Sequence, residues 1–380
     1  MKKLISCVMI LCLMLTLLAG CGSVPTGESE KTETKAPETA AKTTEAKTGT
    51  EDTTTTETEA GPETKELSEL KVGISFYAYA SASAIRQLDY LVYTFEGAGC
   101  TVSYAVCNNS VEQQIADVES LIEQKCDVII LDPCQSEGYD SALADCKAAK
   151  IPVFVMGNAL NSDVYTAGED YVTLLQSDMK LQGENAGNAV LRIVDEKLNG
   201  QTAYCVVVFG TPGMQSATDR LNGYNEVDFA NDSIVTIGTQ TAYNKAADAQ
   251  SIVENYIMSS GGPETEKGVN VIVCMTHNCA IGAVAAIKNM GYTPNKDIYV
   301  VVVDGVKEDL QSILDDELYI AVESPCFYAE QQLDLIQKYF QGETLDSYYE
   351  IKTTVFDAAN AQEWYDNFSK YDELIGYEGQ

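Results

Sequence analysis

The stretch VCMTHNCAIGAV, residues 273 to 284, contains the only histidine of the chain, His277, between Cys274 and Cys279. Imidazole and thiolate are common ligands of Zn²⁺, and they also form the base and nucleophile of Cys-His enzymes. A zinc site needs more ligands than this stretch supplies, and the chain has no second histidine. Two plainer roles remain for His277: a hydrogen-bonding group of a ligand cleft, or a structural residue.

The N-terminus has the order of an export signal. Lys2 and Lys3 precede an apolar run from Leu4 to Leu18, which is too short to span a bilayer and is followed by small residues. The sequence LAGC at 18 to 21 resembles the bacterial lipoprotein box. This resemblance implies a signal peptide over residues 1–20 and a lipid on Cys21 that anchors the protein to the membrane, outside the cytoplasm. An ordinary signal peptide with a chance cysteine is the alternative.

Residues 21–66 consist almost entirely of Thr, Glu, Lys, Ala, Pro and Gly after the cysteine. A segment with so few large apolar residues cannot bury enough surface to offset the entropy of ordering, so we predict a disordered tether. The remaining residues, 67–380, are numerous enough for two ordinary lobes.

Charge and cysteine content limit the classes of partner. The chain has 57 acidic and 24 basic residues, a net charge of -33, which argues against binding of nucleic acid or an anionic membrane surface. Of its 12 cysteines, nine lie beyond Cys21. Several of these fall in apolar runs, so we expect mostly reduced, buried thiols, with one or two disulfides left open.

Short β-branched runs alternate with helical patterns along the rest of the chain. The first four runs are KVGISFY, VSYAVC, DVIILDP and PVFVMGN, and a second set is TAYCVVVFG, SIVTIGTQ, VNVIVCM and IYVVVVDG. Segments with helical spacing, such as VEQQIADVESLIEQ, lie between them. This βαβ order predicts an α/β protein with two similar Rossmann-like lobes built on parallel sheets.

Six motifs carry a family resemblance: DVIILDP, IPVFVMGN, SDMKLQGENAG, GMQSATDRLNGYNE, THNCAIGAVAAIKNMGY and VVVDGVKEDL. In order and spacing they resemble the type 1 periplasmic binding proteins, in particular the ribose- and galactose-binding branch that serves sugar ABC transporters. The resemblance implies that three crossings, near Ser177, Glu323 and Thr353, join the lobes. The N-terminal lobe would comprise 67–177 and 324–352, and the C-terminal lobe 178–323 and 353–380.

The resemblance also implies a ligand site between the lobes. Its polar candidates are Asp132, Asn158, Arg220, Asp304 and Glu323, its aromatic candidates are Tyr77, Tyr79 and Tyr243, and Thr276 and His277 stand where the family usually has Asn-Asp. Carboxylates and arginine suit adjacent hydroxyl groups, and rings suit the apolar face of a sugar. Asp304 is expected to face an empty cleft without a partner. Asp132 could instead cap a helix, and the tyrosines could be rim residues.

Two departures from the family pattern bear on the solute. The segment YASASA, 79 to 84, stands where the family often has Asn-Pro-Phe-Phe, and Gly157 and Asn158 stand where it often has Asp-Arg. Two customary sugar contacts are therefore missing. A simple sugar, a modified or larger sugar, a nucleoside and another polar metabolite all stay open.

The sequence thus predicts a monomeric, lipid-anchored solute-binding protein that delivers a small polar ligand, expected to be a sugar, to an ABC transporter permease, without cofactor or metal. One alternative is a ligand-binding accessory of a membrane sensor. Another is a carbohydrate-active enzyme with Asp304 and Glu323 as an acid-base pair. The export signal argues against a DNA-binding repressor of the same fold.

The lipoprotein box gives a direct prediction. Cys21→Ser should leave the protein unlipidated, either as uncleaved precursor or released, because the thiol that accepts the lipid is gone. Incorporation of labelled fatty acid measures this. Label that still enters the Cys21→Ser protein would contradict the lipoprotein hypothesis.

Overall fold

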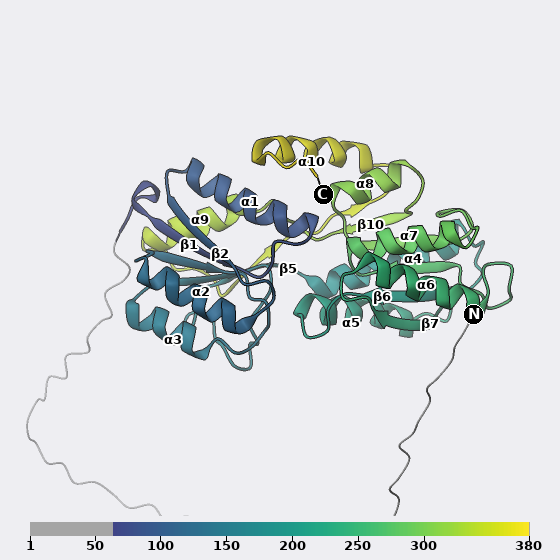
Figure 1. The fold of residues 1–380 in the computed structure, drawn as a ribbon, viewed down its shortest axis with the longest axis horizontal. Coiled ribbons are helices and arrows are strands. Elements are labelled where there is room, and N and C mark those ends of the chain that lie inside the picture. Colours follow the sequence, from purple (N-terminus) through teal and green to yellow (C-terminus); the bar gives the residue numbers. More distant parts are fainter. Residues whose placement is uncertain (1–63, 380) are drawn as a thin grey trace, which may run out of the picture. The chain divides into compact units, whose positions relative to one another are not determined.

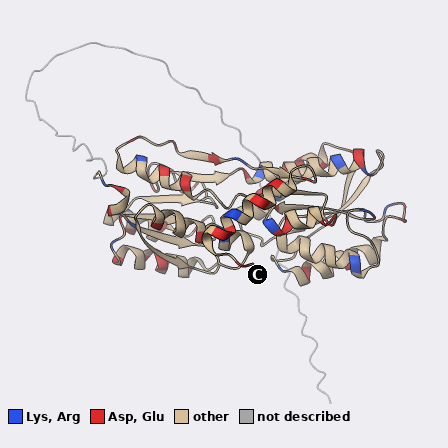
Figure 2. Ribbon diagram, turned by 90° about the horizontal axis from the view of Figure 1, so that it is seen from above, with Lys and Arg blue, Asp and Glu red and all other residues tan. Residues whose placement is uncertain are grey.

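A computed structural model describes residues 64–379 and contains two α/β lobes, each built on a six-stranded sheet (Figure 1). The predicted signal peptide, Cys21 and nearly all of the predicted tether lie outside the described residues. No helix within 64–379 is long and apolar enough to cross a bilayer. Acidic positions lie on the helices of both lobes, with fewer basic ones among them (Figure 2).

The first lobe has a fully parallel sheet in the order β11-β5-β4-β3-β1-β2. Helices α1 and α9 pack on one face and α2 and α3 on the other, so the central strands are buried on both sides. After a 3-10 turn at Leu67–Glu69, its elements are β1 (Lys71–Phe76), α1 (Ala82–Gly97), β2 (Thr101–Val106), α2 (Val111–Glu123), β3 (Val128–Leu131), α3 (Asp140–Ala149), β4 (Val153–Met156), β5 (Leu174–Ser177), α9 (Ala329–Phe340) and β11 (Tyr348–Ile351).

The second lobe repeats this plan with the strand order β12-β10-β9-β8-β6-β7. Helices α4 and α5 cover one face of the sheet, and α6, α7, α8 and α10 cover the other. Its elements are α4 (Met179–Glu196), β6 (Ala203–Phe209), α5 (Gln215–Phe229), β7 (Ile234–Thr241), α6 (Ala246–Ser260), β8 (Val271–Cys274), α7 (His277–Asn289), β9 (Tyr299–Asp304), α8 (Lys307–Leu314), β10 (Ile320–Glu323), β12 (Val355–Phe356) and α10 (Ala361–Ile375).

The eight strands that the β-branched runs predicted are all present, and four more occur where the chain passes between the sheets. The chain leaves the first sheet after β5, returns after β10, and leaves again between β11 and β12. These four strands have only two to four residues, and three of them, LLQS, IAVE and YYEI, contain polar residues. Neighbouring strands rather than their own patterns fix them.

One strand departs from the predicted parallel arrangement. β12 pairs antiparallel with β10, while every other pair in the second sheet is parallel. The strands of both sheets end at the cleft between the lobes, so a segment that continues across the cleft from β11 runs against the strands that it meets. Three residues link β11 to β12, too few for the crossover that a parallel pairing needs.

A buried arginine joins the two lobes. Arg86 of α1 has no exposed surface, and its guanidinium donates to both carboxylate oxygens of Glu308 on α8, each at 2.9 Å. It also donates to Asp372 on α10, at 2.7 Å and 3.1 Å. The Tyr377 ring lies 4.1 Å from the guanidinium carbon. Hydrogen bonds to two carboxylates from other elements compensate for the lost hydration of this cation.

Arg86→Met should destabilise the fold by roughly 3 to 5 kcal/mol, because it leaves Glu308 without a cation and Asp372 with Lys307 alone. Urea unfolding at neutral pH measures this. Arg192→Met is the matched control, since Arg192 also contacts two carboxylates, Glu196 and Asp357, but is 43% exposed. Its loss should cost about 1 kcal/mol or less. Equal costs for the two variants would show that Arg86 does not have the structural role assigned to it.

Candidate functional site

The carboxyl ends of the strands in both sheets surround a cavity of about 290 Å³ between the lobes. Its first-lobe side includes Tyr77 after β1, Asn109 after β2, Asp132 after β3, Asn158 after β4 and Ser177 at the end of β5. Its second-lobe side includes residues that end or follow β6 to β10, among them Gly210, Tyr243, Thr276, Asp304 and Ser324. Ligands bind at this end of open α/β sheets because the loops there are free to carry polar side chains.

Arg220 and Asp304 form an ion pair on the second-lobe wall. The Nη1 of Arg220 donates to Oδ1 of Asp304 at 2.9 Å and to the carbonyl of Met275, while Nε donates to Gln182. Among residues 64–379 the other terminal nitrogen, Nη2, has no hydrogen-bond partner. Arg220 lines the cavity and is only 5% exposed, so this nitrogen can donate to a ligand.

Two glycines allow α5 to hold Arg220 in this place. A Cβ on Gly183 of α4 would lie 1.9 Å from the carbonyl oxygen of Arg220, and a Cβ on Gly223 of α5 would lie 2.0 Å from the carbonyl oxygen of Lys180. Any side chain at either position would push the two helices apart. The close α4–α5 contact therefore depends on glycine at both positions, and it sets the depth at which Arg220 enters the cavity.

Asp304 has a strained backbone, and each of its carboxylate oxygens accepts a hydrogen bond from the protein. Its φ of 123° lies in a region that residues other than glycine rarely adopt. Its Oδ1 accepts from Arg220, and its Oδ2 accepts from the backbone N–H of His277 at 2.9 Å. The expectation that this carboxylate stands unpaired in the cleft is therefore wrong. Strain of this kind persists where the surroundings fix the residue, and it is concentrated at functional sites.

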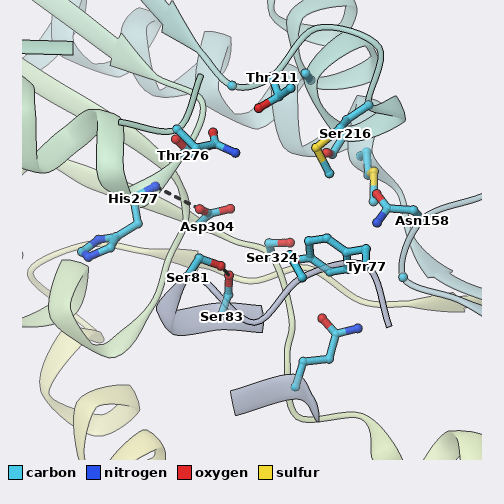
Figure 3. A pocket seen from close by; sticks show the side chains of 18 of the residues that line it. Tyr77, Ser81, Ser83, Asn158, Thr211, Ser216, Thr276, His277, Asp304 and Ser324 are labelled. Carbon is cyan, nitrogen blue, oxygen red and sulfur yellow. Dashed lines mark hydrogen bonds between the residues drawn. The ribbon is translucent and has the colours of Figure 1, made fainter. Parts of the chain in front are cut away.

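The His277 ring is held by α8 rather than offered to the cleft. Although His277 borders the cavity, its Nδ1 lies 2.8 Å from Oδ1 of Asp309, and the ring points away from Asp304 (Figure 3). Burial of the ring favours its neutral form, but the Asp309 carboxylate outweighs this effect and raises the pKa of His277 to about 9. The group that His277 directs to the site is its backbone N–H, which holds Asp304.

The two cysteines beside His277 are structural in this arrangement. Cys274 and Cys279 are completely buried in the core beside α7, and the Cys279 sulfur accepts from the Thr276 hydroxyl. Residues 64–379 contain no cluster of three or more His, Cys, Asp or Glu side chains that could hold a metal ion. All nine cysteines of this region are buried and unbridged.

Asp132 is the most deeply buried carboxylate of the cavity wall, at 1% exposure. Its oxygens accept from the backbone and side-chain N–H groups of Asn158 and from the side-chain amide of Gln87. Burial raises its pKa to about 7, and these three donors limit the rise. The sequence left open that Asp132 caps the following helix. Its carboxylate instead accepts from Asn158 and Gln87.

Eight of the ten candidate side chains border the cavity: Tyr77, Asp132, Asn158, Arg220, Tyr243, Thr276, His277 and Asp304. Tyr79 and Glu323 do not. Tyr79 is 45% exposed, and its hydroxyl donates to Asp89. Glu323 pairs in register with Asp304 on the adjacent strand, but its carboxylate accepts from the backbone of Thr354. Asp304 and Glu323 therefore do not form the acid-base pair that the enzyme alternative required.

The structure adds small polar and sulfur-containing residues that the sequence motifs did not single out. They include Ser81, Ser83, Gln87, Asn109, Ser177, Met179, Thr211, Met214, Ser216, Asn244, Met275, Asn278 and Ser324. Several are labelled in Figure 3. The segment with Ser81 and Ser83 stood out only as the place of a missing ring. Its position directly after a strand was the signal that could have marked it as cavity wall.

Comparison with known proteins gives consistent matches over both lobes. A model of the periplasmic binding protein domain matches residues 80–344. The galactofuranose-binding protein YtfQ of Escherichia coli (strain K12) is 27% identical over 278 residues, 73% of this chain and 84% of the relative. The fructose import binding protein FruE of Bifidobacterium longum (strain NCC 2705) is 24% identical over 276 residues, 72% and 80% of the two chains. The crystal structure of a galactofuranose binding protein superimposes with a TM-score of 0.73 at 25% identity, covering 80% of this chain and 99% of the other.

The His277–Asp309 contact predicts a pH dependence of stability. Because the pKa of His277 is raised from 6.5 to about 9 in the folded protein, the contribution is complete below pH 6.5 and is lost as the pH rises through 9. The loss should reach roughly 3 kcal/mol. His277 is the only histidine of the chain, so its ring proton signal can be followed by NMR without assignment, in protein made without a histidine tag.

We expect that signal to titrate near pH 9, and His277→Gln to reduce the loss of stability between pH 7 and 10 by the share that His277 contributes, while the buried cysteines keep theirs. A ring that titrates near 6.5 would mean that Asp309 does not hold the imidazolium.

Proposed function

The chain belongs to the periplasmic binding protein family, and we propose that it captures a neutral monosaccharide, with a furanose ring as the leading candidate, for an ABC importer. Members of this family are solute-binding proteins rather than enzymes. The relatives named for binding galactofuranose and fructose support a sugar as the ligand. Export and anchoring through a lipid on Cys21 complete the proposal and rest on the N-terminal sequence.

The observation that carries the proposal is the charge balance of the cavity. Among the described residues its wall contains no Lys or Glu, and the single arginine there is neutralised by Asp304. His277 is neutralised by Asp309, outside the cavity wall, and Asp132 is satisfied by amide donors. No cation is left over for a phosphate or a carboxylate, because a buried unmatched charge would be costly. The Asp132 oxygens already accept from three N–H groups, so an ammonium group would lose its hydration without supplying a missing contact. The hydroxyl and amide side chains around the Arg220–Asp304 pair suit a polyhydroxylated neutral ligand.

The apolar contacts and the size of the cavity agree with a single sugar ring. Tyr77, Tyr243 and Tyr328 offer rings, and Met179, Met214 and Met275 offer adaptable apolar surface for the C–H face of a sugar. The volume of about 290 Å³ lies at the lower limit of small-molecule pockets, roughly 300 Å³. Closure of the lobes around such a ligand would shift the protein toward the form that an importer recognises.

A thermal-shift screen tests the proposed ligand class. D-galactose, L-arabinose, D-fructose and D-ribose are the neutral probes, and glucosamine and glucuronate are charged controls of similar size. A neutral sugar present at a hundred times its Kd should stabilise the protein by about 2.7 kcal/mol, while the charged controls should have no effect. Stabilisation by the charged controls and not by the neutral sugars would overturn the proposal.

Asp304→Asn tests the ion pair within the site. Since hydrogen bonds to charged groups contribute about 1.5 to 3 kcal/mol, affinity for the bound sugar should fall roughly ten- to a hundredfold. The unliganded protein should also lose about 1 to 3 kcal/mol of stability, because Asn cannot serve two donors with two acceptor oxygens.

Calorimetric titration and unliganded melting curves measure both effects. Glu323→Gln is the matched control, because Glu323 pairs with Asp304 in the sheet but lies outside the cavity wall. It should keep wild-type affinity. Unchanged affinity in Asp304→Asn would mean that Asp304 only supports the fold and that the ligand binds elsewhere.

A further inference from the structure

The Asp132 carboxylate occupies space that a side chain on the neighbouring strand would need. Asp132 follows β3, and Gly157 follows β4 with a φ of 69°. A Cβ on Gly157 would lie 2.4 Å from Oδ2 of Asp132. Gly157 stands where the family that the sequence resembles often has an aspartate. The carboxylate of Asp132, which comes from the adjacent strand, lies in that place instead.

The contacts of this carboxylate fix two amide side chains. Oδ1 accepts from the backbone N–H of Asn158 at 3.1 Å and from its Nδ2 at 2.9 Å. Oδ2 accepts from Nε2 of Gln87 at 3.0 Å, and the same nitrogen donates to the Tyr328 hydroxyl at 2.6 Å. An ionised carboxylate can only accept hydrogen bonds, so both amides must turn their NH₂ groups toward Asp132.

The carbonyl oxygens of the same amides are left for the cavity. Asn158 and Gln87 both line it, and neither Oδ1 of Asn158 nor Oε1 of Gln87 has a hydrogen-bond partner among residues 64–379. Neither oxygen belongs to the side-chain atoms that are both fully buried and unpaired, so each oxygen keeps some accessible surface. They therefore remain open to a ligand hydroxyl.

We propose that Asp132 is a positioning residue that sets the hydrogen-bond polarity of the first-lobe wall, so that Asn158 and Gln87 present acceptors to the ligand. This inference rests on the proposed function only in taking the ligand to be a sugar. On the opposite wall Nη2 of Arg220 offers donors. A sugar hydroxyl between the walls accepts from Arg220 and donates to an amide carbonyl, and such directional chains strengthen each member.

Protonation of Asp132 reverses this polarity. A carboxylic acid must donate from one oxygen, so one of the two amides has to turn its carbonyl inward and its NH₂ toward the ligand. Burial raises the pKa of Asp132 to about 7, which brings this change near neutral pH. The titratable groups that face Asp132 are Cys134 on its own loop, Tyr77 after β1 and Tyr328 before α9, with the Arg220–Asp304 pair beyond Tyr77.

An NMR experiment tests the positioning role without any ligand. In the ¹⁵N-labelled full chain, the side-chain NH₂ signals of Asn158 and Gln87 should shift together between pH 5 and 9, with a common midpoint near 7. Asp132→Asn should abolish this titration. Glu323→Gln, which removes a buried carboxylate outside the cavity wall, should leave it intact. Side-chain NH₂ signals that do not change with pH, or that change equally in Asp132→Asn, would overturn the proposal.

Binding of fluorinated sugars tests the polarity itself. The probes are L-arabinose and D-galactose, each compared with its monofluoro-deoxy analogues at pH 8.5, because a C–F group cannot donate a hydrogen bond. At one position at least, fluorine should weaken binding to the wild type about tenfold or more. In Asp132→Asn, Gln87 turns its NH₂ toward the ligand. The loss of affinity that the same fluorine causes should then fall to about threefold or less. An unchanged penalty in Asp132→Asn would overturn the proposal.

The two arms separate the failure of this inference from failure of the proposed function. If no sugar binds the wild type, the proposed function is wrong, and the amide titration still decides the role of Asp132. If Asp132→Asn does not fold, Gln87→Met replaces it, since this variant removes one amide and keeps the carboxylate. In Gln87→Met the side-chain NH₂ signal of Asn158 should still shift with pH. The variant should bind the sugar and its fluorinated analogue equally well when the fluorine replaces the hydroxyl that Gln87 contacts. Loss of the Asn158 titration in this variant, or full discrimination at every position, would overturn the proposal.

Discussion

The buried Arg86 guanidinium is the interaction on which the arrangement of the two lobes depends. It joins α1 of the first lobe to α8 and α10 of the second lobe through four hydrogen bonds. A cation with no exposed surface has lost its hydration completely, so its partners must stay in place for the fold to hold. The next residue along α1, Gln87, contacts Asp132 in the cavity wall. The same turn of helix thus fixes the lobes and positions part of the site.

On the second-lobe wall of the cavity, a second set of buried charges is also held by partners that replace lost hydration. Asp304 is held by Arg220 and by the backbone of His277, while the His277 ring is held by Asp309. Each of these charged groups has a partner at hydrogen-bond distance, so the second-lobe wall is held in place before any ligand binds. The strained φ of Asp304 persists because Arg220 of α5 and the backbone of His277 in α7 both hold its carboxylate. A preorganised site of this kind loses less entropy on binding.

The glycines at 183 and 157 show how small residues shape the site from a distance. Gly183 lets α4 approach the carbonyl of Arg220, which fixes the arginine, and Gly157 leaves room for Asp132. In both cases the absent side chain belongs to one element and the functional group to another. A substitution that adds a single methyl group would therefore displace a residue of the cavity wall that is distant in sequence.

The sequence by itself determined the α/β class and eight of the strands, because hydrophobic period is a local property. The expected crossings and the Arg220 and Asp304 motifs came from a family resemblance instead. The sequence did not reveal β5, β10, β11 or β12, which are short segments stabilised by neighbouring strands. It also could not reveal that Asp304 is paired, that the His277 ring belongs to Asp309, or that Glu323 turns away from the cavity. These outcomes depend on which side chains from remote segments meet at each carboxylate, and only the tertiary structure decides that.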